Sequence, residues 1–240
     1  MPVTLNAQQL YQDGRLEDAI QVLGSTLRSN PADVRARTFL FELLCFAGEY
    51  DRAEKQLDII SGGSKEATMG ALLYRSALHG ERSRQELFQS GQISEPPPAP
   101  VSGTLNGERF DSISDADPRV GARLEVIAAG QYTWVPLAQI AEMGMEAPTR
   151  LRDLLWAPAR VKAGPGLKDF EFGEVIVPVV APLSWQHEDG NVRLGREVAW
   201  ADLADGGEAP LGPKLLDVDG ELIPMLEVRE LIIDSPDASE

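Results

Sequence analysis

The chain has 240 residues, enough for one large domain or two smaller ones that each bury a core. Its 38 acidic and 22 basic residues give a formal charge of -16, without a cluster of Lys and Arg. Nucleic acid and anionic membranes are therefore poor partner candidates, because both are bound through clustered cations. The charge favours a basic protein or peptide as partner; alternatively, the acidity only aids solubility.

The sequence carries one cysteine, Cys45, within the apolar stretch 39–46. A single cysteine excludes an internal disulfide, and its apolar neighbours indicate a core residue rather than a nucleophile. Residues 1–6 lack the basic and apolar regions of a signal peptide. The longest apolar run, 175–183, is too short to span a bilayer. We therefore expect a cytoplasmic protein.

A repeat occupies the start of the chain. Four positions recur at a separation of 34 residues, so that Leu10, Gly14, Ala19 and Leu23 are followed by Leu44, Gly48, Ala53 and Leu57. A glycine in the inter-helix turn and a small residue early in the second helix are typical of tetratricopeptide helical hairpins. Asn30-Pro31 ends the first unit, because proline cannot continue the helix.

Two further helical segments, 65–78 and 81–89, are expected to cap the repeat, since repeat helices need neighbours to cover their apolar faces. Stacked helix pairs form a concave groove that the first helix of each pair lines. The predicted partner-binding residues there are Gln8, Gln9, Gln12, Arg35, Thr38 and Glu42. The alternative is that these residues belong to solvated helix faces without a ligand.

Residues 94–100, Ser-Glu-Pro-Pro-Pro-Ala-Pro, predict a stiff and extended connection. A recognition motif for a partner is the alternative interpretation. The sequence thus predicts a helical domain at 1–91, a linker at 92–103, a second domain at 104–234 and a disordered acidic tail at 235–240.

The second domain carries hairpin signals. Asn106-Gly107 and Asp219-Gly220 each lie between short extended runs, the pattern of a two-residue turn. The predicted strands are 123–127, 131–135, 174–180, 214–218 and 221–223. The expected fold class of the whole chain is α+β, with tetratricopeptide-like all-α hairpins followed by a β-rich domain.

One pattern occurs twice in this domain. The segment Gly130-x4-Val135-Pro136-Leu137-x2-Ile140 resembles Gly220-x2-Ile223-Pro224-Met225-x2-Val228. Both predict a hairpin, a strand, a proline and a short helix, and the first such helix is expected over 137–143. We interpret the similarity as two independent uses of one arrangement; internal duplication is the alternative.

Patterns of catalytic and metal sites are missing. His187, Glu188 and Asp189 are adjacent, so they do not easily converge on one ion, and a solvated loop is favoured. The sequence contains no Cys-rich zinc spacing, no phosphate-binding glycine loop and no Gly-x-Ser-x-Gly. We therefore expect no catalytic residue, cofactor or metal.

Distinct motifs lie at residues 102–107, 113–121, 130–137, 151–159 and 193–196 in the second half, and at 30–35 and 39–45 in the first. These segments resemble the ImpE family, also called TagJ. The resemblance extends over roughly residues 8–234 and keeps the motifs in order.

That family consists of accessory components of the bacterial type VI secretion system. The resemblance implies a cytoplasmic role at the contractile sheath and binding of the small, TssB-like sheath subunit. It also implies a link to ClpV, the AAA+ ATPase that disassembles contracted sheath, and it implies no enzymatic activity. The function expected from it is a non-enzymatic adaptor that receives a helix of the sheath subunit.

The sequence departs from the family between the repeats and the motif at 102–107. Other members usually carry an extra helical stretch there, whereas only residues 91–102 fill this space. For Trp134 and Trp156, which match family motifs, we expect core or interdomain roles. For Arg152 and Asp153 a structural ion pair is favoured over a functional one.

Two other functions remain open. One is an enzyme whose site lies near Asp115, Asp117, Arg152 and Asp153, although Asp117 before Pro118 more simply caps a turn or helix. The other is a general tetratricopeptide-type peptide-binding chaperone. That function predicts a basic clamp for an acidic peptide tail, and the chain offers few Lys or Arg to build one.

Overall fold

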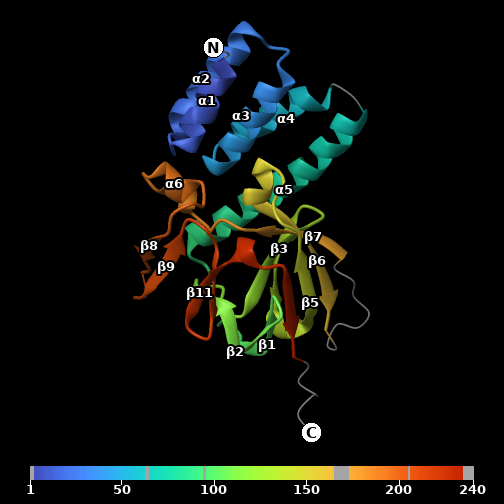
Figure 1. The fold of residues 1–240 in the computed structure, drawn as a ribbon, viewed down its shortest axis with the longest axis vertical. Helices are drawn as coiled ribbons and strands as arrows, with labels where there is room; N and C mark the ends of the chain where they lie inside the picture. Colours follow the sequence, from blue (N-terminus) through green and yellow to red (C-terminus); the bar gives the residue numbers. More distant parts are fainter. Residues whose placement is uncertain (1–2, 63–64, 94–95, 165–172, 205, 235–240) are drawn as a thin grey trace.

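The computed structural model describes residues 3–62, 65–93, 96–164, 173–204 and 206–234. Five helices come first and a curled antiparallel sheet follows them (Figure 1), which confirms the predicted α+β class. The helices are α1 Val3–Gln12, α2 Leu16–Ser29, α3 Val34–Phe46, α4 Tyr50–Ser61 and α5 Lys65–Ser90. The predicted tail, 235–240, and linker residues 94 and 95 lie outside the described residues.

The first four helices form the two hairpins that the 34-residue repeat predicts. Gly14 and Gly48 occupy the turns with φ of +73° and +70°. Residues with a side chain rarely adopt this backbone conformation, so glycine is favoured at both turns. Ala19 and Ala53 are fully buried and let the paired helices approach closely.

α5 is one helix, so the predicted break between 65–78 and 81–89 is wrong. Gly80 continues the helix, and its missing side chain lets α5 lie against strand β3 (Arg123–Ala128). A Cβ at Gly80 would lie 2.5 Å from Cγ2 of Ile127. The 26 residues extend over about 39 Å, so α5 reaches from the repeat to the sheet (Figure 1).

In the described part of the chain, ten strands form one antiparallel sheet in the order β11-β10-β2-β1-β12-β5-β6-β7-β3-β4. Besides β3, they are β1 Val101–Leu105, β2 Glu108–Asp115, β4 Gln131–Pro136, β5 Ile140–Met145, β6 Trp156–Ala163, β7 Gly173–Pro178, β10 Leu215–Val218, β11 Glu221–Pro224 and β12 Glu230–Ile233. A separate ribbon pairs β8 Ala199–Asp202 with β9 Glu208–Leu211.

The two halves of the large sheet have the same arrangement. Outwards from the central β12–β5 pair, β1, β2, β10 and β11 on one side correspond to β6, β7, β3 and β4 on the other. The hairpins β3–β4 and β10–β11 both turn through two residues with positive φ, Ala129-Gly130 and Asp219-Gly220. Each hairpin ends at a proline that precedes a 3-10 turn, η1 Leu137–Gln139 or η5 Met225–Glu227. The pattern found twice in the sequence thus corresponds to equivalent places in two similar half-sheets.

The short helix predicted for residues 137–143 is wrong. Only η1 is helical, and β5 begins at Ile140. Ile140 and Met143 both face the core, a spacing that is helical in appearance. It arises in a strand because the register with β6 shifts between Ile140 and Glu142, and a bulge changes which side chains face inward.

The sheet begins at Val101, inside the segment predicted as linker. The end of the proline-rich stretch lies against the sheet domain. A Cβ at Gly121 would lie 2.3 Å from Cβ of Pro97, and the Arg123 guanidinium donates a hydrogen bond of 2.7 Å to the carbonyl of Pro96. This part of the connection is therefore held in place by the domain that follows it.

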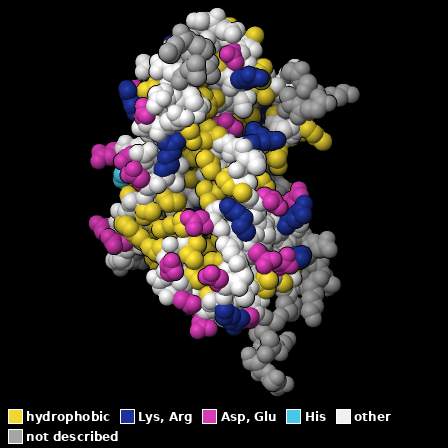
Figure 2. Space-filling model, in the orientation of Figure 1, with side chains coloured by type: hydrophobic (Ala, Val, Ile, Leu, Met, Phe, Trp, Pro, Cys, Tyr) yellow, Lys and Arg dark blue, Asp and Glu magenta, His cyan; other side chains and the backbone are white. Residues whose placement is uncertain are grey.

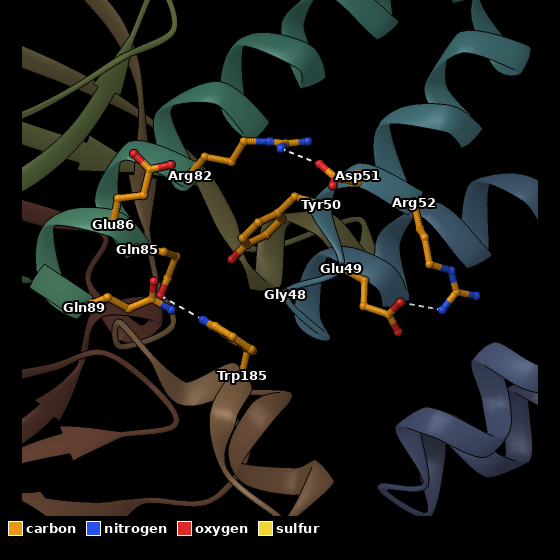
Figure 3. A pocket seen from close by; sticks show the side chains of 10 residues that line it. All are labelled: Gly48, Glu49, Tyr50, Asp51, Arg52, Arg82, Gln85, Glu86, Gln89 and Trp185. Atoms are coloured by element: carbon orange, nitrogen blue, oxygen red, sulfur yellow. Dashed lines mark hydrogen bonds and ion pairs between the residues drawn. The ribbon is translucent and has the colours of Figure 1, made fainter.

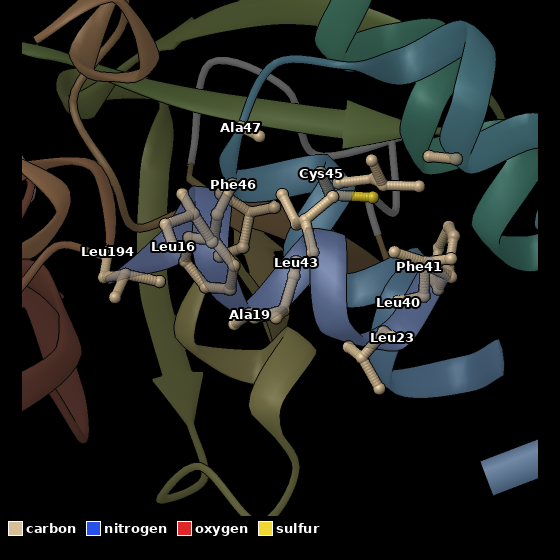
Figure 4. Close-up of a cluster of buried hydrophobic side chains, with 14 of the residues drawn as sticks. Leu16, Ala19, Leu23, Leu40, Phe41, Leu43, Cys45, Phe46, Ala47 and Leu194 are labelled. Carbon is tan, nitrogen blue, oxygen red and sulfur yellow. The ribbon is translucent and has the colours of Figure 1, made fainter. Parts of the chain in front are cut away.

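The helical region and the sheet share a hydrophobic core. One buried cluster contains the inward faces of the helices together with Leu155, Trp156, Val180 and Leu194 from the second half of the chain. Figure 4 shows part of this cluster, with Leu194 beside Leu16. A second cluster lies within the sheet. Because one core crosses the boundary, the two regions pack as one body.

Five buried charged residues, which we call the ionic cluster, also join the two regions: Glu81 and Arg84 on α5, and Asp115, Glu125 and Lys214 in the sheet domain. Arg84 donates from Nε and Nη2 to the two carboxylate oxygens of Glu125 at 2.8 and 3.2 Å, and from Nη1 to Glu81 at 3.1 Å. Lys214 pairs with both Glu125 and Asp115. Buried charges are tolerated because each one has partners in a fixed geometry.

The pKa values of Glu125 and Asp115, two carboxylates of this cluster, shift in opposite directions. Burial opposes ionisation of Glu125, yet Arg84 and Lys214 together hold its pKa well below the usual range. Burial raises the pKa of Asp115 to about 6, and the neighbouring Glu125 adds to this effect, whereas Lys214 opposes it. Glu125 is therefore the anion on which the contact between α5 and the sheet depends.

Both repeat turns receive a side chain from the segment that contains η4 Ser184–Gln186 and α6 Gly190–Arg193. A Cβ at Gly48 would lie 2.6 Å from the Trp185 ring, and a Cβ at Gly14 would lie 2.5 Å from the Asn191 side chain. Gly190 is equally restricted, because its Cβ would lie 1.9 Å from the carbonyl oxygen of Gly14. The repeat glycines thus serve the tertiary packing as well as the turns.

The motif at 193–196 completes this contact. The Arg196 guanidinium donates hydrogen bonds of 2.8 and 3.2 Å to the carbonyls of Tyr11 and Gln12, at the end of α1, and its Cζ lies 4.3 Å from the Tyr11 ring centroid. Arg193 pairs with Glu17 at the start of α2. A cation at a helix C-terminus and an anion at a helix N-terminus are both favourable.

Arg84→Met should lower the free energy of unfolding by about 3–5 kcal/mol, because it leaves a buried carboxylate with one cation fewer. Arg82→Met is the matched control on the same helix. Arg82 pairs with Asp51 and Glu54 near the surface, so its loss should change stability by less than about 1 kcal/mol. Urea unfolding of both variants, followed by circular dichroism, measures the difference. Equal effects of the two substitutions would contradict the role assigned to Glu125 and Arg84.

Candidate partner-binding groove

A groove of about 520 Å³ lies between the first helices of the two hairpins and a segment of the sheet domain. α1 and α3 form one wall, and residues 148–154, which include the 3-10 turn η2 Leu151–Leu154, form the other. In Figure 1 this second wall is the yellow segment beside α5. The apolar lining residues are Tyr11, Phe39, Pro148, Leu151 and Leu154, and polar or charged side chains come from Gln8, Arg35, Glu42, Thr149 and Arg150.

Both walls are held in place by short-range contacts. The rings of Tyr11 and Phe39 meet edge to face, with centroids 5.7 Å apart. Asp153 fixes the start of η2, because its carboxylate accepts hydrogen bonds from the backbone amides of Thr149 and Arg150 at 2.9 and 2.8 Å. The groove is therefore a preformed feature of the packed molecule.

Glu42 and Arg152 meet where the two walls come together. Nη1 of Arg152 lies 3.6 Å from Oε1 of Glu42, and its Cζ lies 4.3 Å from the ring centroid of Tyr74 on α5. Nε of Arg152 is buried and has no hydrogen-bond partner among the described residues. Arg152 thus links the repeat, α5 and η2.

The pKa of the Glu42 carboxyl is raised from 4.5 to about 7, mainly by burial. Arg152 and Arg150 oppose this shift, whereas nearby Asp153 contributes to it. Burial also raises the pKa of Tyr74, again opposed by the two arginines. Glu42 therefore changes its charge close to neutral pH.

Three of the six predicted partner-binding residues line this groove: Gln8, Arg35 and Glu42. The structure places the other three outside its lining. The Gln9 side chain bonds Asp13 on the exposed face of α1, and the Thr38 hydroxyl donates to the carbonyl of Val34. Gln12 is exposed at the end of α1, where Arg196 binds its carbonyl. Whether a partner contacts any of the six stays a prediction.

Sequence reasoning missed the second wall altogether. Leu151 and Leu154 follow α3 by more than 100 residues, and repeat periodicity gives no information about a segment outside the repeat. Their only signal was the motif at 151–159, whose residues pack against the repeat through Arg152 and against α5 through Trp156. Nε1 of Trp156 donates to Glu81 at 3.0 Å, which confirms an interdomain role.

A second pocket of about 460 Å³ lies at the α3–α4 turn (Figure 3). Its walls are the start of α4, one face of α5 and the ring of Trp185. Several of the side chains that line it are already engaged: Arg82 pairs with Asp51, and Nε1 of Trp185 donates to Gln85 at 3.1 Å. This pocket is the polar rim of the contact between the helices and the sheet domain.

Each of the four residues of the possible enzyme site binds a different group of the fold. Asp115 and Asp117 are buried, where Asp115 pairs with Lys214 and Asp117 binds Arg119 in a turn. Arg152 contacts Glu42, and Asp153 caps η2, so the predicted Arg152–Asp153 ion pair is replaced by two separate contacts.

No group of three or more His, Cys, Asp or Glu in the described ranges has the arrangement of a metal site. None of the helices that the structure describes combines the length and hydropathy needed to cross a bilayer. Cys45 is buried, as expected for a core residue, and burial raises the pKa of its thiol.

Both parts of the chain resemble known proteins. Residues 107–232 match the family described as ImpE protein, and residues 10–63 match a tetratricopeptide repeat. The type VI secretion system accessory component TagJ of Pseudomonas aeruginosa is 29% identical over 272 positions, which cover 98% of this chain and 94% of that protein. The crystal structure of protein VPA1032 from Vibrio parahaemolyticus has the same fold, with a TM-score of 0.83, 23% identity and coverage of 98% of this chain and 100% of that one.

Glu42→Gln should stabilise the protein at pH 8 by on the order of 1–3 kcal/mol and have no such effect at pH 4. The pKa of Glu42 is higher in the folded than in the unfolded state, so the protonated carboxyl stabilises the fold at low pH. This contribution is lost as the pH rises through about 7. Urea unfolding at both pH values measures it, with Glu86→Gln as control for the loss of one exposed negative charge. A pH-independent effect of Glu42→Gln would contradict the assignment.

Proposed function

The chain belongs to the ImpE family, and we propose that it is an adaptor of a bacterial type VI secretion system that acts by binding other proteins. Two findings support this proposal. The similarity to the Pseudomonas aeruginosa accessory component extends over nearly the whole of both chains. The repeat at residues 10–63 belongs to a class of helical hairpins that form concave binding surfaces.

The groove between α1, α3 and η2 is the proposed docking site. The observation that carries this assignment is its construction: Tyr11 and Phe39 line one fixed wall with apolar side chains, and Leu151 and Leu154 line the other. A helix that inserts apolar side chains at intervals of three and four residues suits such a groove. Because the walls are preformed, little ordering of the receptor opposes binding.

The proposed occupant is a helix of the small, TssB-like sheath subunit, and the complex would assist the ClpV-type ATPase in sheath disassembly. This role places the protein in the cytoplasm, where the contracted sheath is taken apart. Catalysis is not part of the proposal. Asp115, Asp117 and Asp153 already bind neighbouring groups of the fold, which favours structural roles for them.

Gln8→Trp is the test of the docking site. Gln8 is exposed and lines the groove, so a Trp there should fill the space without removing a buried contact. Binding of the purified small sheath subunit to the full chain should weaken at least tenfold, or about 1.4 kcal/mol, by calorimetry.

Gln9→Trp is the matched control, since Gln9 is exposed on the same helix but outside the groove, and its binding should be unchanged. If Gln8→Trp binds the sheath subunit as tightly as Gln9→Trp, the groove is not the site. Failure of the unaltered chain to form any complex with the sheath subunit or the ATPase would refute the adaptor function in this system.

A further inference from the structure

The groove differs in charge from the rest of the molecule. The chain has a formal charge of -16, and Asp and Glu side chains are spread over the face displayed in Figure 2. The charged side chains that line the groove are nevertheless two arginines, Arg35 and Arg150, and one carboxyl group, Glu42. The local charge is therefore opposite in sign to the charge of the whole chain.

Neither arginine pairs with a carboxylate among the residues that the structure describes. Arg35 is exposed on α3, and its guanidinium makes no ion pair or hydrogen bond with another described residue. Arg150 is exposed on the opposite wall and hydrogen-bonds with Tyr74, but it has no carboxylate partner in the part of the chain that the structure describes. Unpaired guanidinium groups bind carboxylates strongly, because both hydrogen bonds carry charge.

Glu42 does little to offset these two cations. Its carboxylate lies 3.6 Å from Arg152, which neutralises it locally. Burial also raises the pKa of Glu42 to about 7, so a fraction of the molecules carry no charge there at neutral pH. The carboxylate of Asp153, another nearby acid, accepts hydrogen bonds from the backbone amides of Thr149 and Arg150, just before η2. The electrostatic field at the mouth of the groove is thus set by Arg35 and Arg150.

We propose that the segment bound in this groove is an amphipathic helix whose apolar stripe is bordered by acidic side chains, which pair with Arg35 on one wall and Arg150 on the other. This inference rests on the proposed function, since it names the chemistry of the helix that the adaptor receives. The apolar stripe contacts Tyr11, Phe39 and the η2 leucines. The acidic border fixes the register of the helix and excludes basic helices, because like charges facing one another oppose binding.

An acidic helix is not the partner that the net charge of the whole chain favours. An acidic protein is expected to prefer a basic partner when charges are spread evenly over its surface. At contact distance the near charges dominate, because ions screen interactions beyond about 8–10 Å.

Two synthetic helices of about 20 residues test this chemistry. They share one leucine stripe at intervals of three and four residues, and differ only in whether Glu or Lys borders it. With the full chain, fluorescence anisotropy should show at least tenfold tighter binding of the Glu peptide, and the preference should shrink as salt is added. Gln8→Trp should weaken binding of the Glu peptide.

The charge-reversed variant Arg35→Glu/Arg150→Glu should lose the preference for the Glu peptide or invert it. Arg28→Glu/Arg160→Glu is the matched control, because both of its positions are exposed and outside the groove and the change in net charge is the same. The control variant should keep the preference of the unaltered chain. This comparison separates contacts in the groove from the effect of total charge.

Equal or tighter binding of the Lys peptide to the unaltered chain would overturn the inference, and so would absence of binding by both peptides. If the purified small sheath subunit still binds in either case, the proposed function survives and only the acidic border is wrong. Conversely, a clear preference for the Glu peptide together with no binding of the sheath subunit supports the groove chemistry and refutes the sheath as partner.

Discussion

The contact between Arg84 and Glu125 is the interaction on which the rest of the structure depends. Both side chains are buried, and each would be unstable at this depth without the other. A buried ion pair tolerates little displacement, because a shift of the helix would leave a charge without its partner. The pair therefore fixes where α5 lies on the sheet. The shared core and the contacts of Trp185, Asn191 and Arg196 with the repeat then hold the repeat itself in place.

The groove is a consequence of that fixed position. One wall belongs to the repeat and the other to a segment that follows α3 by more than 100 residues, so neither wall alone forms a site. Residues of the family motifs make the contacts that hold the two regions together around the groove. Trp156 donates a hydrogen bond to Glu81, Arg196 donates to a carbonyl at the end of α1, and Arg152 lies beside Glu42. Much of the family-specific sequence outside the repeat thus holds the two regions together.

The charge of the groove, like its shape, depends on how the two regions pack. Total charge is a property of composition, but a ligand meets only the groups within a few ångströms of it. Acidic side chains are engaged by capping and pairing around the groove, as Asp153 and Glu42 show. Arg35 and Arg150 are left facing the space between the walls, and the site acquires a sign that the composition does not reveal.

The sequence by itself determined the helical hairpins, the hairpin turns of the sheet and the family, because these depend on local backbone preferences and on motifs read in order. Gly14 and Gly48 mark the inter-helix turns, because both adopt a positive φ that favours glycine. Asp219-Gly220 specifies a two-residue turn without reference to the rest of the chain. Predictions from local residue patterns were wrong or incomplete where contacts with distant segments decided the structure. The spacing of Ile140 and Met143 is helical in appearance, but both residues belong to a bulged strand. The second wall of the groove exists only because buried charges and a shared core place residues 148–154 beside α3. Long-range pairing is decided by the folded environment as a whole, so only the tertiary structure shows which distant residues meet.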